Sequence, residues 1–427
     1  MNKLLQAGDT GYDEARSVWN AMVDRYPAAI ARCHDTADVV AAVRFAREAG
    51  LEIGVRCGGH SIAGHAVPDG GLMIDLTPMN AVQVDPDRQL AWVQGGALLG
   101  ELDKAAQQYG LATTAGNVSH TGVGGLTLGG GMGWLARQFG LACDNVASYE
   151  LVTADGDVVR ASADENAELF WGLRGGGGNF GIVTSFEFRL HHIGTRALVA
   201  EFTYPSSAGF DVLRAWRELN TTASRQATFT ASITPDAVTV GYVWVGDGGF
   251  ELLDAFRAMS PTAEHVEETS YLTLQSRDDN VQGHRYRRYW KGHYFKALPD
   301  AAIRALLRTP GVSASLQAYG GAIADVLDDD AAFSHRDTLF EFVTATRWED
   351  PAEDATRIGQ LREYAATLAP YSNGAYLNVL NGDSISRAFP PAKLTRLTAL
   401  KTAYDPANVF HLNQNIRPGG ASTTNAA

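Results

Sequence analysis

The sequence predicts an α+β protein built in two parts, and two observations carry this prediction. Over the first 195 residues helix and strand patterns alternate and glycines cluster, whereas later glycine becomes rare and longer strand patterns appear between helical stretches. We therefore expect a first domain over 1–195, a second α+β domain with a large antiparallel sheet over 196–384, and a return to the first domain over 385–417. Residues 418–427 are expected to be a disordered tail.

Caps and turns place the elements of the first part. Thr36 can cap a helix that runs to Ala49, with Gly50 as its stop signal. Asp155-Gly156 lies between two apolar runs and predicts a β-hairpin. Strand patterns of the first part occupy 51–55, 71–76, 90–96 and 181–190, and a further helix pattern occupies 97–110. Strand patterns of the second part occupy 198–204, 227–234, 237–246, 313–321 and 338–348.

Charge and cysteine content argue against several classes of protein. Asp and Glu number 48 against 35 Lys and Arg, a net charge of −13, which opposes binding to nucleic-acid phosphates. Three cysteines (Cys33, Cys57 and Cys143) in so long a chain do not make a disulfide scaffold. No apolar run reaches the ~18 residues of a membrane span, and the first residues lack a signal-peptide core. We expect a cytoplasmic protein without a nucleic-acid or membrane partner; its oligomeric state is open.

Glycine is concentrated in three clusters, 56–61, 122–133 and 174–181, with a weaker asparagine-containing motif at 412–415. Glycine lets backbone N–H groups approach a ligand closely, so three clusters favour a nucleotide-type ligand over three unrelated tight turns. Gly176, Gly178 and Gly181 match G-x-G-x-x-G, but a helix pattern precedes them and a strand follows, the reverse of a Rossmann turn. If a dinucleotide is bound, another fold binds it.

His60 is the first candidate for chemistry, because it follows two glycines at a strand-to-loop corner, beside Arg56 and Ser61. Cys57, His60 and His65 together suggest a metal site, but a fourth ligand at suitable spacing is missing, so we predict no metal. The flanking glycines suit a flat ligand better. A purely structural histidine is the alternative.

The segment VRCGGHSIAGHAVPDGGLMIDL resembles the flavin-linking segment of the PCMH-type FAD-binding oxidoreductases of the vanillyl-alcohol oxidase superfamily, most closely the berberine-bridge-enzyme-like branch. The resemblance continues through GNVSHTGVGGLTLGGGMGWLARQFGLACDN, ELFWGLRGGGGNFGIVTSFEF and YDPANVFHLNQNIRP, and covers about 25–195 and 385–417. It implies a two-part FAD-binding domain and FAD bonded through its 8α-methyl to His60.

Departures from the family pattern refine this expectation. Bicovalent members carry a cysteine that bonds flavin C6 and a histidine after GVGG; the matching residues here are Val118 and Leu126. The resemblance therefore implies a single histidyl bond, as in the 6-hydroxy-nicotine-oxidase type. The cofactor-binding residues it implies are Arg56, Cys57, Gly58, Gly59, His60, Ser61, Val118, Gly122, Gly124, Gly125, Gly181, Ile182, Val183, Tyr376, Asn413 and Asn415.

The resemblance also assigns the chemistry. Val379 replaces a tyrosine that often acts as base, which leaves Glu341 at the carboxylate position used as base by other members; a paired core carboxylate is the alternative. Thr121 matches the oxygen-approach position, where its hydroxyl and His120 would donate to a reduced oxygen species, unless Thr121 only bonds a carbonyl and fills space. Tyr319, His293 and Asn378 are further candidates, the first two either facing the flavin or lying elsewhere.

The expected activity is an FAD-dependent oxidase of secondary metabolism that removes a hydride from a small phenolic, alkaloid or polyketide-like metabolite, with O₂ as acceptor and H₂O₂ as product. The alternatives are an oligosaccharide oxidase, which Val118 opposes, an oxygenating enzyme, and a non-catalytic flavin carrier or sensor, which His60 and Glu341 oppose. Six aromatic residues either line an aromatic pocket or belong to the core: Tyr242, Trp244, Tyr286, Tyr289, Trp290 and Tyr294.

Overall fold

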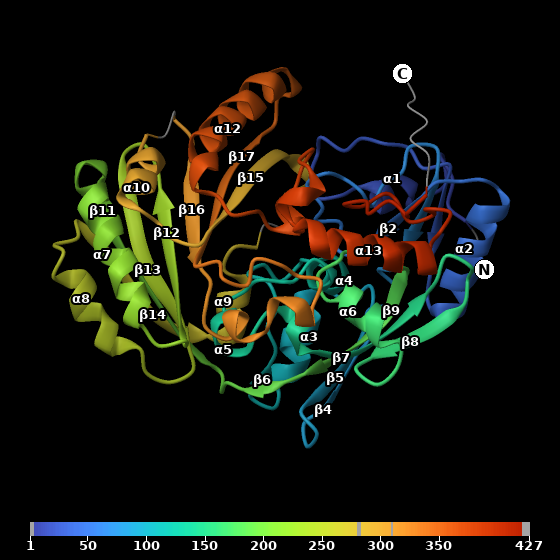
Figure 1. The fold of residues 1–427 in the computed structure, drawn as a ribbon, viewed down its shortest axis with the longest axis horizontal. Coiled ribbons are helices and arrows are strands. Elements are labelled where there is room, and N and C mark those ends of the chain that lie inside the picture. Colours follow the sequence, from blue (N-terminus) through green and yellow to red (C-terminus); the bar gives the residue numbers. More distant parts are fainter. Residues whose placement is uncertain (1–3, 280–282, 309–310, 421–427) are drawn as a thin grey trace.

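The computed structural model describes residues 4–279, 283–308 and 311–420, and it has two parts that lie side by side (Figure 1). The first part contains both ends of the described chain, and the second part is formed by the middle of the chain. The two-part α+β architecture expected from the sequence is confirmed. The end of the expected tail, 421–427, lies outside the described residues, and the limits of the four predicted segments stay a prediction.

A small parallel sheet opens the first part, in the order β1 (Ala29–Arg32), β3 (Leu72–Asp75), β2 (Ile53–Arg56). Helix α2 (Thr36–Glu48) packs on it through an apolar face that includes Val39 and Val43. Its capping residue is Asp35, whose carboxylate accepts a hydrogen bond from the backbone N–H of Asp38, so the expectation for Thr36 was wrong by one residue. Thr36 instead donates its hydroxyl to Glu150, at 2.9 Å.

A five-stranded antiparallel sheet completes the core of the first part. The hairpin predicted at Asp155-Gly156 joins its last two strands, and Gly156 has a φ of 78°, which a glycine adopts without strain. The order is β4 (Val82–Asp85), β5 (Leu90–Gln94), β9 (Ile182–Arg189), β7 (Val146–Val152) and β8 (Val158–Ser162).

The second part is a seven-stranded sheet in which every pairing is antiparallel. Its order is β14 (Ala263–Ser270), β11 (Arg196–Pro205), β13 (Ala237–Val245), β12 (Ala227–Ile233), β16 (Ala314–Ala318), β17 (Phe340–Trp348) and β15 (Arg287–Phe295). The sequence did not predict the two edge strands. β14 is mostly exposed and charged, so it has no apolar alternation, and a glycine and several charged residues interrupt β15.

The two faces of this sheet have different neighbours. Helices α7 (Gly209–Thr222), α10 (Asp300–Leu306) and α12 (Asp354–Leu368) cover one face, where Trp216 and Tyr364 join the largest apolar core (Figure 1). The other face packs against the first part of the chain, with Tyr294 and Tyr319 beside Met132. Side chains that alternate along β15, β16 and β17 therefore reach either the helices or the first part.

The C-terminal segment fastens the first part. Helix α13 (Pro391–Tyr404) packs on α6 (Ala167–Leu173), as Figure 1 shows. Lys401 is fully buried and donates to the Asp405 carboxylate at 2.7 Å and to the carbonyls of Asn179 and Phe410 at 2.8 and 2.9 Å. Since Asn179 belongs to the third glycine cluster, Lys401 holds that cluster against α13 and against Phe410, in the segment after this helix.

The remaining elements are short, and several lie between the two sheets. They are α1 (Tyr12–Arg16), α3 (Leu99–Gln107), β6 (Leu111–Ala112), α4 (Val123–Leu128), α5 (Ala136–Phe139), β10 (His191–His192), α8 (Leu253–Arg257), α9 (Tyr271–Ser276) and α11 (Ala322–Asp325). Among the described residues, none of the helices combines the length and apolar character needed to cross a membrane.

Candidate active site

A cavity of about 420 Å³ lies where the three glycine clusters meet the C-terminal segment. Residues far apart in the sequence form its wall, which is the arrangement that the clusters predict for a shared ligand. Of the expected cofactor-binding residues, the wall includes Cys57, Gly58, Gly59, His60, Ser61, Val118, Gly122, Gly124, Gly125, Gly181, Ile182, Val183, Tyr376 and Asn413.

The glycines of this wall serve two different purposes. A Cβ on Gly122 would lie 2.3 Å from the backbone nitrogen of Gly58, so these two loops touch through their main chains and neither tolerates a side chain. A Cβ on Gly125 or Gly178 would meet nothing within 4 Å. These two glycines are therefore not required by packing within the protein, and they leave open space in the cavity for a ligand.

The polar atoms of the wall also fit a large ligand with many hydrogen-bonding groups. Among the described residues, the side-chain oxygens of Asn117 and Asn413 are buried without a hydrogen-bond partner. An unpaired buried acceptor costs about 1–3 kcal/mol, so a bound group that donates to these oxygens is favoured. The cavity, its backbone-lined walls and these oxygens therefore fit FAD.

His60 is held in one orientation at one end of the cavity. Its ring stacks on Trp19, with centroids 4.8 Å apart and planes 15° apart, and its Nε2 lies 2.7 Å from Nδ1 of His120. The Thr121 hydroxyl is 3.5 Å from the other ring nitrogen, Nδ1. Burial, reinforced by His120 and the charge of Arg288, lowers the pKa of His60 to about 3. His60 is therefore neutral at physiological pH and keeps a lone pair for bonding.

Glu341 lies beside the cavity on β17, with 8% of its surface exposed. The pairing of the strands sets Tyr294 and Gln317 on either side of it, and the Tyr319 hydroxyl donates to its Oε2 at 2.7 Å. Burial raises the pKa of Glu341 to about 7, although the bond from Tyr319 acts in the opposite direction. No Lys or Arg forms an ion pair with Glu341 in the part of the chain that the structure describes. It is thus a buried carboxyl poised to exchange a proton near neutral pH.

The cavity wall also includes Tyr376, Asn378 and Val379, which come before the C-terminal helix α13. The Tyr376 hydroxyl accepts from the backbone N–H of Gly131 at 3.0 Å and from Nδ2 of Asn378 at 2.8 Å. Burial raises the pKa of Tyr376, so its phenol stays protonated. Val379 fills the position where the family pattern has a tyrosine, and its side chain has no group that exchanges a proton.

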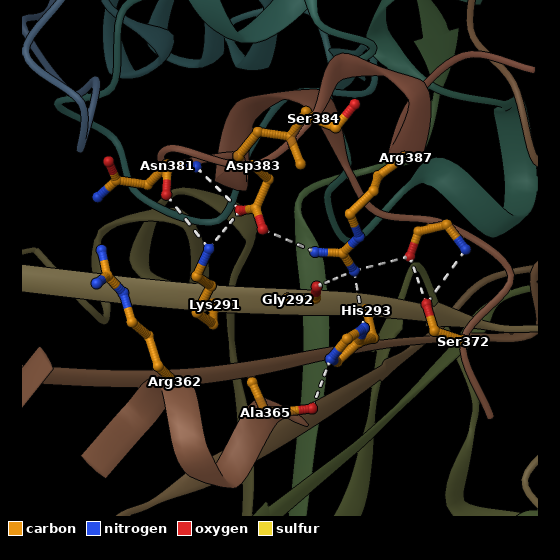
Figure 2. A network of polar contacts seen from close by, with 12 residues as sticks. Lys291, Gly292, His293, Arg362, Ala365, Ser372, Asn381, Asp383, Ser384 and Arg387 are labelled. Carbon is orange, nitrogen blue, oxygen red and sulfur yellow. Dashed lines mark hydrogen bonds and ion pairs between the residues drawn. The ribbon is translucent and has the colours of Figure 1, made fainter. Parts of the chain in front are cut away.

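A polar network at the edge strand β15 holds residues 381–387, which follow these cavity-lining residues (Figure 2). Arg387 donates to the carbonyl of Gly292 at 3.0 Å and to Nδ1 of His293 at 2.8 Å, and pairs with Asp383 at 3.2 Å. Asp383 also binds Lys291, at 2.6 Å. The network joins β15 to the loop that follows the cavity-lining residues, so it positions them from outside the cavity.

Several candidate residues lie elsewhere than expected. His293 is on the opposite face of the sheet from Glu341 and bonds the carbonyl of Ala365, so it does not face the cavity. The Arg56 guanidinium turns to the carbonyl of Ala15, and Asn415 is also outside the wall. Tyr319 and His120 contact Glu341 and His60 respectively from behind the wall.

Some of the six aromatic residues of the second part lie at the cavity and others lie away from it. Trp290 lines the cavity, and Tyr294 lies beside it. Tyr242, Trp244 and Tyr289 belong to the core on the helix-covered face. Tyr286 lies near the guanidinium groups of Arg288 and Arg347.

Sequence reasoning missed Trp19, which stacks on His60 from 41 positions earlier in the chain. It also missed Asn117, whose Nδ2 donates to Gln317 on β16 at 3.1 Å. No local pattern marks either residue, because each contact joins distant segments. Asn117 lies inside the motif GNVSHTGVGG, which was the only signal for it, whereas Trp19 precedes all the segments that carry the resemblance.

Comparisons with known proteins agree with this geometry. The profile described as "FAD binding domain" matches residues 27–162, and that described as "Berberine and berberine like" matches 375–417. The chain is 31% identical to an uncharacterized FAD-linked oxidoreductase, YgaK, of Bacillus subtilis, over 97% of each chain. It is also 31% identical to (R)-6-hydroxynicotine oxidase of Paenarthrobacter nicotinovorans, over 98% of this chain and 97% of that one.

Among solved structures, glucooligosaccharide oxidase from Acremonium strictum superposes with a TM-score of 0.89 at 26% identity, over 97% of both chains. The chain therefore belongs to the berberine-bridge-enzyme-like family of FAD-linked oxidoreductases. The resemblance seen in the sequence is confirmed, and with it FAD as the cofactor and oxidoreduction as the class of reaction.

Proposed function

We propose that this protein is an oxidase that carries one histidyl-linked FAD and removes a hydride from a small aromatic metabolite, with Glu341 as the base and O₂ as the electron acceptor. The single observation that carries the proposal is Glu341 itself. It is a buried carboxyl without a cationic partner among the described residues, bonded to Tyr319 at 2.7 Å and adjacent to the cavity wall. A carboxyl in this state has a pKa of about 7.

His60 would hold the cofactor covalently, while the backbone groups of Gly58, Gly122 and Gly178 would contact its flat and anionic parts. When bound, FAD supplies the two-electron chemistry, taking a hydride from the substrate and passing the electrons to O₂ to give H₂O₂. Val118 lines the cavity and has no nucleophile. The glucooligosaccharide oxidase structure is described as carrying 6-S-cysteinyl, 8α-N1-histidyl FAD, so Val118 supports one attachment here instead of two.

Glu341 would take the proton of a substrate hydroxyl or phenol as the substrate is oxidised. The Tyr319 hydroxyl stabilises the ionised form of Glu341, since a hydrogen bond to a carboxylate favours its charge. Proton removal and electron removal then occur on the same substrate without a free charge left in the apolar site. Tyr376, already accepting from Gly131 and Asn378, orients the wall beside it.

The aromatic character of the substrate is supported by the wall on the side of the second part. Trp290 and Val379 line the cavity, and Trp290 meets Trp19 edge-on with ring centroids 5.5 Å apart. Such surfaces suit flat, apolar rings. A phenolic, alkaloid or polyketide-like metabolite fits this description. An oligosaccharide is the second candidate, because a relative at 29% identity over 98% of this chain is named glucooligosaccharide oxidase.

The acceptor is proposed to be O₂ because Thr121 lines the cavity and differs little from valine in volume, so it leaves gas access open. Its hydroxyl is a donor on the cavity wall, where reduced oxygen would carry charge, whereas His120 lies behind the wall and bonds His60 instead. The test is to mix reduced enzyme with aerated buffer and follow re-oxidation, for the wild type and Thr121→Val. Slow re-oxidation of the wild type would refute an oxidase; equal rates in both proteins would remove Thr121 from oxygen chemistry.

The cytoplasm is the proposed compartment. Its support is that Cys33, Cys57 and Cys143 are all free thiols and that two of them are fully buried, as expected where thiols stay reduced.

A peroxide-release screen decides the proposed function. The purified enzyme is offered phenols, alkaloids and hydroxylated aromatic polyketides in one set and mono- and oligosaccharides in the other. We expect turnover with a member of the first set, lost in Glu341→Gln. Turnover with sugars alone would replace the substrate class, and bound flavin that no compound in either set reduces would support a carrier or sensor.

A further inference from the structure

We infer that His120 is the proton acceptor for flavin attachment: it takes the Nε2 proton of His60 while Nδ1 of His60 bonds to the 8α carbon of FAD. This inference rests on the proposed covalent attachment and adds a residue to it. It assigns His120 a positioning and proton-accepting role, which acts through His60.

The geometry distinguishes the two nitrogens of His60. Nε2 is engaged by Nδ1 of His120 at 2.7 Å, and His120 is not part of the cavity wall, so this edge of the ring points away from the ligand. Nδ1 is the other edge, 3.5 Å from the hydroxyl of Thr121, which does line the cavity. Stacking on Trp19, with planes 15° apart, prevents the ring from exchanging the two edges easily.

This arrangement also sets the tautomers. A neutral imidazole has one N–H donor and one acceptor nitrogen. If Nε2 of His60 donates to Nδ1 of His120, the lone pair of His60 is on Nδ1, on the cavity side, and the proton of His120 is on its Nε2. His60 is thus prepared as a nucleophile, and the proton it must lose already lies in a hydrogen bond to an acceptor.

The charges nearby favour transfer in this direction. Arg288 lies close to both rings and opposes a positive charge on either one, and burial acts in the same sense. Asp279 acts only on His120, where it favours the protonated form. The Asp279 carboxylate is held in place by Ser119, whose backbone N–H and hydroxyl donate to it at 2.9 and 2.5 Å. Asp279 thus offsets part of the effect of burial on His120 and none of it on His60, so His120 is the better placed of the two histidines to take the proton.

The attachment balances as follows. The N–C bond between His60 Nδ1 and the 8α carbon forms, and one C–H bond of the 8α-methyl and the Nε2–H bond of His60 break. The two electrons released pass through the flavin ring to O₂, which with two protons becomes H₂O₂. The proton from His60 leaves by way of His120, so the linked imidazole ends neutral. Without an acceptor it would be left as a buried cation near Arg288, which is costly.

The test measures the rate of attachment, not turnover. Wild type, His120→Ala and His120→Asn are produced in riboflavin-limited cells, mixed with FAD and quenched in acid at intervals, and the acid-stable flavin fluorescence of the protein band is followed. We expect attachment to slow by about 10²-fold or more in both variants, the lower part of the range for loss of a general base. Both variants should still bind about one FAD per chain non-covalently, measured as the flavin that acid releases before attachment has begun. His191→Ala removes a part-buried histidine outside the cavity that also bonds an asparagine, and it should attach FAD at the wild-type rate.

His120→Asn separates proton transfer from a merely structural hydrogen bond, because its amide oxygen accepts the bond but does not take the proton. A further readout is pH: attachment in His120→Ala should accelerate roughly tenfold for each pH unit, as hydroxide replaces the missing base, whereas the wild type should be nearly independent of pH above 7. Attachment at the wild-type rate in His120→Ala, or full rescue by Asn, would overturn the inference.

The linking nitrogen is read from the purified flavin peptide by heteronuclear correlation spectra. The 8α methylene protons should couple to Cγ and Cε1 of the imidazole if the bond is at Nδ1, and to Cδ2 and Cε1 if it is at Nε2. The second pattern would overturn the inference. A failure of the proposed function is a different result: wild-type flavin fully released by acid, or acid-stable flavin that persists in His60→Ala.

Discussion

The two walls of the active site are built in different ways. The first part of the chain contributes main chain: glycines of three clusters, with Gly58 and Gly122 in direct backbone contact. The seven-stranded sheet contributes side chains: Trp290 lines the cavity, and Glu341, bonded to Tyr319, lies on the same face of the sheet behind that lining. A cofactor recognised by backbone demands one residue type at fixed spacings. The side chains that meet on a sheet face depend on which strands are neighbours, and the spacing of residues along the sequence does not reveal the strand order.

Burial acts on both walls but prepares opposite kinds of group. On the first wall it lowers the pKa of His60 to about 3 and keeps a nucleophile permanently neutral. On the second wall it raises the pKa of Glu341 to about 7, so this group changes charge within the physiological range. The same desolvation therefore gives one group whose state is fixed and one whose state responds to pH.

The largest expected effect tests the sheet wall. Glu341→Gln keeps the shape of the side chain but takes no proton, so reduction of the flavin by substrate should slow by about 10²–10⁴-fold. The measurement is anaerobic stopped-flow at the flavin absorbance. Glu187→Gln is the control, since Glu187 is on β9 of the five-stranded sheet and its carboxylate is already engaged by Ser148 and Arg160. Near-normal reduction in Glu341→Gln would reassign Glu341 to a structural role.

The next effect tests the backbone wall. Gly125 in α4 and Gly359 in α12 are both helical glycines whose Cβ would meet nothing within 4 Å, but only Gly125 lines the cavity. The added methyl group of Gly125→Ala should overlap with the cofactor and reduce the free energy of FAD binding by about 1–3 kcal/mol. Non-covalent FAD binding should therefore weaken by about 10- to 100-fold. Gly359→Ala should leave binding unchanged and stabilise the helix by about 0.5–1 kcal/mol. Equal FAD affinities in the two variants would mean that Gly125 does not face the cofactor.

A smaller effect concerns pH. Below pH 7 the rate of flavin reduction should fall about tenfold per unit as Glu341 becomes protonated, and above pH 7 it should level off. Tyr319→Phe removes the bond that favours the carboxylate, so the midpoint should move up by about one unit. A midpoint that stays in place in Tyr319→Phe would contradict the role given to that bond.

The same pKa has a consequence for stability with a defined sign. Because the pKa of Glu341 is raised in the folded protein, its stabilising contribution is complete below the unfolded value of about 4.3 and is lost as the pH rises through about 7. Glu341→Gln should therefore be more stable than the wild type above pH 7, with the difference vanishing near pH 4. Thermal unfolding across this range checks the sign, and a variant that is less stable at pH 8 would contradict it.

The smallest effect lies between the two walls, in the network of Figure 2. Arg387→Lys keeps the charge but cannot reach Gly292, His293 and Asp383 together. Because the loop carrying Tyr376 and Asn378 is then less firmly held, we expect a loss of up to about tenfold in kcat/KM, since reaction rates depend on precise positioning. Arg257→Lys, at an exposed pair with Glu264, is the control and should behave as the wild type. A full loss of FAD would show that Arg387 supports the fold more widely.

The sequence by itself determined the cofactor wall. The three glycine clusters, His60 beside its two glycines and the hairpin at Asp155-Gly156 are local features, because backbone approach and positive φ angles require glycine wherever they occur. Val118 likewise stands at its motif position and lines the cavity. The family resemblance added Glu341 from its position in the motif, but not its surroundings.

Only the tertiary structure decided which side chains meet. Tyr319, the residue after the neighbouring strand β16, reaches Glu341. His293, on the other neighbouring strand, points to the helix-covered face because successive strand residues alternate. Trp19 and His120 meet at His60 from separate segments. The pKa values of His60 and Glu341 likewise depend on burial that the whole fold creates. Contacts between distant segments leave no pattern along the chain, since each depends on strand order and facing, which form only when the protein folds.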